Sequence, residues 1–151
     1  MFLGFLALFA CSPAKAQNRV HFISTGAKEG SAPPAVCVQQ AQAAIQIIRL
    51  YPHPDTWTWV VVCDDLAWQR WERHISWNEN GSPLLALTDR ASRVTYLRGP
   101  AILHPAMQAA ARPEHFIAHE LAHIAMNSSD ESAVDRLAWK WQNGIRDVAV
   151  K

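Results

Sequence analysis

The sequence predicts a small α+β protein with a single domain, a short sheet and a helix that carries the candidate site. Its 151 residues, half of them hydrophobic, suffice for one compact core. Over residues 19–97, short runs rich in β-branched and aromatic residues alternate with segments of helical periodicity. From Pro113 onward the periodicity is helical. A chain whose strands all lie in its first part and whose last part contains only helices is typical of the α+β class.

Residues 1–16 are predicted to be a signal peptide and residues 17–151 one domain. The chain opens with an apolar run, and residues 14–16 (AKA) form a small-x-small cleavage pattern. About ten apolar residues are too few for a bilayer span, which needs roughly 20. We therefore expect a periplasmic or secreted protein without a membrane span once the leader is removed. A lipid anchor on Cys11 is one alternative, because residues 8–11 (LFAC) resemble a lipoprotein box, and a retained or mis-started N-terminus is another.

Residues 19–63 predict a strand, a helix and a second strand. Residues 19–24 (RVHFIS) are typical of a strand, and residues 26–34 form a loop rich in glycine and proline. The stretch 35–50 has apolar residues at spacings of three and four, which predicts a helix with one buried stripe. Residues 56–63 (TWTWVVVC) predict a well-buried strand.

The rest of the chain before the candidate site predicts a helix and a hairpin. Apolar spacing over residues 66–75 indicates a helix, and residues 78–83 (NENGSP) a turn. Strands at 84–88 and 94–97 are expected to pair as a hairpin. Beyond the helix that starts at Pro113, a last helix is expected to end at a left-handed C-cap, which an Asn-Gly pair at 143–144 would form.

Two cysteines remain after the leader, Cys37 and Cys63. An even number in an exported chain favours a disulfide. Cys37 falls on a predicted helix and Cys63 at the end of a predicted strand, so packing of that helix on that strand would bring them together. Two buried thiols that pack as small hydrophobic groups are the alternative. C-x-x-C spacing is absent, so neither a zinc ribbon nor a thioredoxin-like redox centre is predicted.

The helix that begins at Pro113 carries the pattern His-Glu-x-x-His. At 100° per residue, His119 and His123 lie on one face, where two imidazoles can reach one Zn²⁺ ion at about 2.0–2.1 Å. Glu120 is rotated by about 100° from His119 and is placed to take a proton from a water on the metal. A solvated helix face with two unrelated histidines is the alternative. The opposite face carries the apolar stripe Ile117, Leu121 and Ile124.

Residues 119–123 (HELAH), followed by residues 131–135 (ESAVD), resemble the zincin metallopeptidases of the gluzincin kind over about 25 residues. These carry a Glu-x-x-x-Asp motif on the helix after the His-Glu-x-x-His helix. The resemblance implies a zincin-like fold, in which a hairpin precedes the active-site helix and an edge strand aligns a peptide.

The resemblance also implies a role for each matching residue. His119, His123 and Glu131 would bind Zn²⁺, and Glu120 would be the general base. Asp135 would orient the imidazole of a ligand histidine, and its position one turn after Glu131 permits this.

The short interval between the two motifs departs from the large gluzincins and leaves Asp135 or Asp130 as alternative ligands. Ser128 and Glu131 also match a capping box, which would direct Glu131 to the backbone instead. No residue stands out as a donor to an oxyanion, for which the candidates are Tyr96, His115 and Arg136. The remaining histidines His21, His53, His74 and His104 are expected at the surface. His115, four residues before His119, is expected to be exposed at the start of its helix, with a place in the lining of the pocket as the alternative.

The predicted function is that of a zinc-dependent metallopeptidase, a hydrolase that acts on peptide or protein substrates through a zinc-activated water. Basic and acidic residues number 14 and 13 and are interspersed, which argues against nucleic acid and an anionic membrane surface as partners. The first alternative is a catalytically inactive zinc-binding envelope protein that acts as a binding or assembly module. The second is a structural domain without metal. The sequence leaves the substrate and the oligomeric state open.

Overall fold

The computed structural model describes residues 18–26, 31–75, 84–104 and 111–149. The predicted signal peptide with Cys11 and the predicted turn at 78–83 lie outside these residues.

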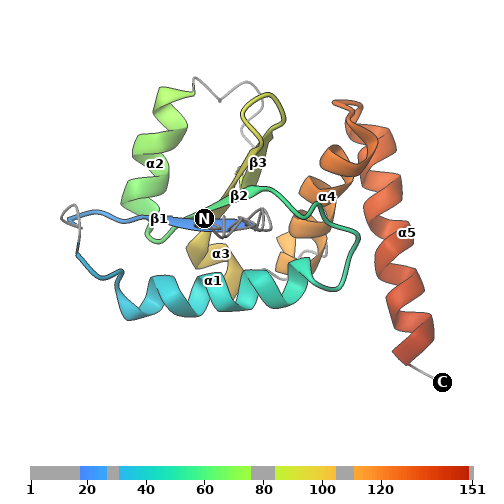
Figure 1. Cartoon of the computed structure of the whole chain (residues 1–151), viewed down its shortest axis with the longest axis horizontal. Coiled ribbons are helices and arrows are strands. Elements are labelled where there is room, and N and C mark those ends of the chain that lie inside the picture. The colour runs from blue at the N-terminus through green and yellow to red at the C-terminus, as the bar shows by residue number, and fades with distance from the viewer. Residues whose placement is uncertain (1–17, 27–30, 76–83, 105–110, 150–151) are drawn as a thin grey trace, which may run out of the picture.

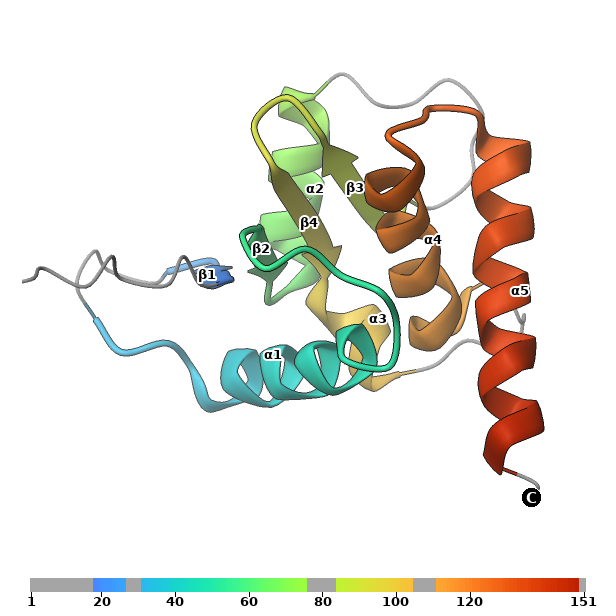
Figure 2. The same cartoon turned by 45° about the vertical axis from the view of Figure 1, so that its right-hand side comes forward.

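The structure is of the α+β class, as predicted, with one four-stranded mixed sheet. Its strands are β1 (Arg19–Ile23), β2 (Thr58–Val62), β3 (Ala86–Asp89) and β4 (Val94–Arg98), in the order β1-β2-β4-β3. β1 and β4 pair with β2 in parallel, whereas β3 pairs antiparallel with β4 and forms the predicted hairpin. β3 is therefore an edge strand, and it faces the helix that carries the candidate site (Figure 2).

Helices lie on both sides of the sheet and beyond its β3 edge (Figure 1). They are α1 (Ala35–Ile48), α2 (Asp65–His74), α3 (Gly99–Leu103), α4 (Pro113–Met126) and α5 (Glu131–Ala149). The short α3 was not predicted. The expected C-cap at 143–144 is wrong, because α5 continues through Gly144 to Ala149. One glycine inside a long helix costs only about 1 kcal/mol, which the rest of the helix outweighs.

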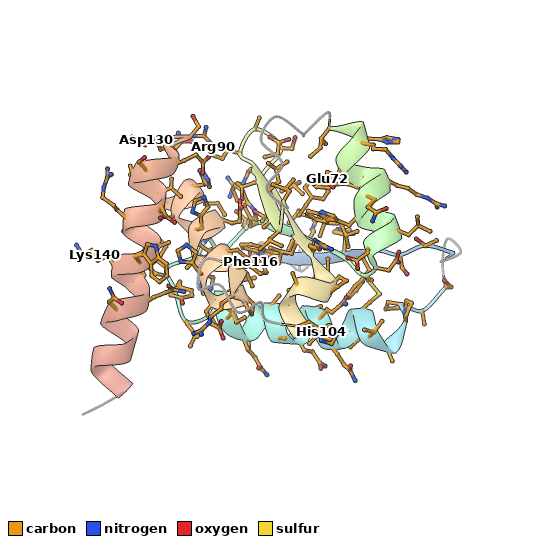
Figure 3. All side chains as sticks on the ribbon, turned by 180° about the vertical axis from the view of Figure 1, so that it is seen from behind. Glu72, Arg90, His104, Phe116, Asp130 and Lys140 are labelled. Atoms are coloured by element: carbon orange, nitrogen blue, oxygen red, sulfur yellow. A yellow bond between two sulfur atoms is a disulfide. The ribbon has the colours of Figure 1, made fainter. Side chains whose placement is uncertain are left out.

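Alternation along β2 explains why helices cover both faces of the sheet. Trp59 and Val61 pack toward the α1 and α4 side, whereas Val60 and Val62 pack against α2. All four side chains are buried, as the period of two in a strand requires when both faces are covered. In Figure 3, Phe116 points from α4 into this core and Lys140 points away from it on the outer side of α5. None of the described helices is both long and apolar enough to cross a membrane.

The predicted disulfide between Cys37 and Cys63 is present and joins α1 to the end of β2, with the two Cα atoms 5.1 Å apart. Both cysteines are buried. The bond fits an extracellular location, because disulfides persist in oxidising compartments.

Asp64 ties the end of β2 to the chain that leaves β1. Its carboxylate caps α2 by accepting a hydrogen bond from the amide of Ala67 at 2.8 Å. It also accepts from the hydroxyl of Ser24 at 3.0 Å and from the amide and hydroxyl of Thr25, both at 2.7 Å. Burial raises the pKa of Asp64, but the bonds from Thr25, Ala67 and Ser24 outweigh it and lower this pKa to about 2.

Candidate metal centre

A tight turn between α4 and α5 folds the second acidic motif back onto the first. α4 ends at Asn127, which adopts a left-handed conformation at φ 46°. The amide of Ser128 then donates to the carbonyl of His123 at 3.3 Å, a bond typical of helix C-caps. Asn127 is held in turn by Arg90 of the hairpin loop, whose guanidinium donates to its side-chain oxygen at 3.1 Å.

Asp130 caps α5, and the capping box between Ser128 and Glu131 that stood as the alternative does not form. The carboxylate of Asp130 accepts from the amide of Ala133 at 3.1 Å, while the hydroxyl of Ser128 accepts from the amide of Asp130 at the same distance. An aspartate two residues closer to the helix than Ser128 satisfies the first turn directly. The side chain of Glu131 is consequently directed to the histidines of α4.

Three side chains that the motif singled out converge at one point. Nε2 of His119 lies 3.0 Å from one carboxylate oxygen of Glu131, and Nε2 of His123 lies 3.5 Å from the other. The two Nε2 atoms are 3.1 Å apart. Ligands at about 2.05 Å from a tetrahedral ion lie about 3.3 Å from one another, so the spacing suits one Zn²⁺ ion.

The opposite side of each ring is held by a protein acceptor. Nδ1 of His123 donates to the carbonyl oxygen of Ser128 at 2.8 Å, which places the proton on Nδ1 and the lone pair on Nε2. Nδ1 of His119 lies 3.4 Å from a carboxylate oxygen of Asp135. Two imidazole nitrogens and a carboxylate that face one another can share a proton or bind a cation, and this donor set fits Zn²⁺.

Asp135 is on the far side of His119 from Glu131. Its Oδ1 atom lies 3.0 Å from Nε2 of His115 as well as 3.4 Å from Nδ1 of His119. His115 is only 3% exposed, so the prediction of a surface position is wrong. Trp139 of α5, whose ring centroid is 4.1 Å away, packs against it and excludes water. The other four histidines, His21, His53, His74 and His104, are exposed as predicted.

Glu120 is buried beside His119 and His123, and a residue of the sheet holds its carboxylate in place. It is 7% exposed, and its carboxylate accepts a hydrogen bond from the hydroxyl of Thr88 in β3. Burial raises the pKa of Glu120, and the bond from Thr88 and the charges of His123 and His119 reduce this rise without cancelling it. A raised carboxylate pKa is characteristic of a general base or acid.

Thr88 is the near end of a chain of hydrogen bonds that sequence reasoning missed. Its hydroxyl oxygen lies 2.8 Å from that of Thr95 in β4, which accepts from the indole N–H of Trp57 at 2.9 Å. The sequence offered no signal beyond two threonines that the period of two places on one face of a hairpin.

Tyr96, one of the three candidate donors to an oxyanion, does not reach this site. Its ring packs on Trp71 at 4.4 Å on the α2 side of the sheet, away from α4. Arg136 is exposed on α5.

Among the described residues, two sets of three side chains could hold a metal ion: His119, His123 and Glu131, and His115, His119 and Asp135. The chain matches no protein-family model, no curated protein and no solved structure. The functional argument therefore rests on the motif and on this geometry.

Proposed function

We propose that the protein is a zinc-dependent metallopeptidase with His119, His123 and Glu131 as metal ligands and Glu120 as the general base. One observation carries this proposal. The Nε2 atoms of both histidines meet the carboxylate of Glu131, while Ser128 and Asp135 hold the opposite ring nitrogens. A solvated helix face would not need this second set of acceptors.

The position of the acidic residues favours Glu131 as the third ligand. Its two oxygens approach the Nε2 atoms of His119 and His123, whereas Asp135 approaches only the Nδ1 side of His119. A carboxylate on that side fixes the tautomer and orientation of the ring and raises its basicity. Asp130 is engaged as the cap of α5.

The bound zinc would supply a Lewis acid that polarises the peptide carbonyl and makes water a nucleophile near neutral pH. Glu120 then takes a proton from the attacking water and passes it to the nitrogen of the leaving amine. The bond from Thr88 fixes the position of its carboxylate for both transfers. Asp135 and Ser128 keep Nδ1 of the two histidines protonated, so that both Nε2 atoms stay free to bind metal.

The proposal includes export to the periplasm or the medium. The disulfide between Cys37 and Cys63 supports it, because such bonds are rare in reducing compartments.

A catalytically inactive zinc-binding envelope protein is the second candidate, and the burial of Glu120 favours it. A base that is 7% exposed needs some movement of its surroundings before substrate and water meet it. In this case the zinc would stabilise a binding or assembly module.

The variant Glu120→Gln separates the two candidates. Wild type and variant are loaded with zinc, their metal content is measured, and both are incubated with a peptide library that is read by mass spectrometry. We expect equal zinc content, cleavage by wild type only, and full activity for the control Glu114→Gln at the exposed start of α4. Cleavage by the Glu120→Gln variant at the wild-type rate would exclude Glu120 as the base. Equal inertness with zinc retained would favour the inactive envelope protein.

A further inference from the structure

His115 lies one helical turn before His119 but takes no part in the proposed ligand set. It is 3% exposed, packed on Trp139, and flanked by polar groups from α5 at both ring nitrogens. Nε2 lies 3.0 Å from Oδ1 of Asp135, and Nδ1 lies 3.2 Å from Oε1 of the side-chain amide of Gln142, which is itself 7% exposed. A buried histidine that is paired at both nitrogens holds the groups around it in one arrangement.

The hydrogen-bond roles follow from Asp135. A carboxylate only accepts, so Nε2 of His115 donates its proton to Oδ1, and Nδ1 of His119 faces the same oxygen at the ion-pair distance of 3.4 Å. The other nitrogen of His115 is then an acceptor, and the amide of Gln142 can donate to it after rotation of its terminal group. The result is a continuous chain from Gln142 through His115 and Asp135 to His119.

We propose that His115 is a positioning residue that holds Asp135 against Nδ1 of His119 and thereby raises the zinc affinity of the site. This inference rests on the proposed metal centre. The side chain of Asp135 is 47% exposed, so water competes for its oxygens and its rotamer is not fixed by packing alone. His115 supplies the anchor, because Trp139 and Gln142 fix its ring.

The helix sets the spacing of this arrangement. His115 and His119 are four residues apart on α4 and thus stand one above the other, and a single oxygen of Asp135 bridges them. The same three groups would bind a second cation if both ring nitrogens lost their protons. The number of zinc ions bound per chain distinguishes such a second metal site from the positioning role.

The test measures zinc affinity by chelator competition at fixed pH, without reference to hydrolysis. We expect His115→Leu to weaken zinc binding about 10-fold, and Asp135→Ala by about 10–100-fold, as is usual for partners of metal ligands. His115→Gln, which keeps a donor near Asp135, should stay within about threefold of wild type. The double variant His115→Leu/Asp135→Ala should bind zinc no more weakly than Asp135→Ala alone, because His115 acts through Asp135.

Several outcomes would overturn the inference. Full additivity in the double variant would show that His115 does not act through Asp135. Two zinc ions per chain in wild type, falling to one in His115→Leu, would make His115 a ligand. If circular dichroism shows that His115→Leu fails to fold, Gln142→Leu replaces it and should also weaken zinc binding. Unchanged zinc affinity in Gln142→Leu would contradict the chain of contacts from Gln142 to His119.

The proposed function can fail separately from this inference. A wild type that binds no zinc would remove both. Zinc affinities that follow the expected order in a protein without peptidase activity would support the role of His115 and contradict the peptidase.

Discussion

Replacing Thr88 with valine tests whether the sheet holds the candidate base. Trp57 can only donate, so Thr95 accepts from it and directs its own proton to Thr88, which in turn donates to the ionised carboxylate of Glu120. Valine has the shape of threonine but can neither donate nor accept. The variant therefore loses the two bonds of Thr88 with little change in packing.

The magnitude follows from the two bonds. A hydrogen bond to a charged group contributes about 1.5–3 kcal/mol to the free energy of unfolding, and one between two hydroxyls about 0.5–1.5 kcal/mol. Thr88→Val should thus destabilise the protein by about 2–4.5 kcal/mol. In the Glu120→Met background only the bond to Thr95 remains to be lost, so the same change should cost about 1 kcal/mol.

Urea unfolding of the metal-free protein, followed by tryptophan fluorescence, measures these free energies. The coupling between Thr88 and Glu120 should be about 1.5–3 kcal/mol, and Thr58→Val in β2 is the matched control. Additive effects within about 0.5 kcal/mol would refute the bond from Thr88 to the carboxylate. A base positioned by other groups would then be required.

Three further predictions concern the disulfide, the metal ligands and Asp64. Labelling of unfolded, unreduced protein should find no free thiol at Cys37 or Cys63, and reduction should lower the free energy of unfolding by about 3–4 kcal/mol, because the bond closes a loop with a sequence separation of 26 residues; two labelled thiols would contradict the bridge. In chelator competition, Glu131→Ala should lose most zinc affinity and Asp135→Ala only about 10–100-fold, with helix content checked by circular dichroism; the reverse order would exchange their roles. Asp64→Asn should cost about 1 kcal/mol at pH 7, because an amide has one acceptor oxygen where the carboxylate has two that accept from Ser24, Thr25 and Ala67. Because the folded pKa of Asp64 is lowered to about 2 from 3.8, its stabilisation is present above pH 3.8 and is lost as the pH falls through 2. The difference in urea midpoint between wild type and this variant should shrink over that range, and a constant difference down to pH 2 would contradict the lowered pKa.

Much of the fold could be predicted from local sequence because its elements have clear periodicity. Residues 56–63 and the hairpin strands have the composition of buried strands, and the stripe of 35–50 has helical spacing. The pairing of Cys37 with Cys63 followed from the packing of that helix on β2. The predicted strands and helices recur in the structure with boundaries shifted by one or two residues, except at the C-terminal end of α5.

What could not be predicted depends on contacts between distant segments. His115 is buried because Trp139 and Gln142 of another helix cover it, and nothing within its own helix indicates this. The chain from Thr88 to Trp57 joins two strands and the loop before β2. The capping role of Asp130 depends on the geometry of the turn between α4 and α5, which the sequence pattern at Ser128 and Glu131 does not show.

X-ray absorption at the zinc edge of the purified protein, quantified per chain, tests the central claim most directly. With His119, His123 and Glu131 as ligands, the spectrum should show one zinc per chain with two imidazole nitrogens and oxygen ligands at about 2.0–2.2 Å. Glu131→Ala should lose the metal under the same loading conditions. Absence of zinc from wild type, or a shell of sulfur or of three imidazoles, would contradict the account.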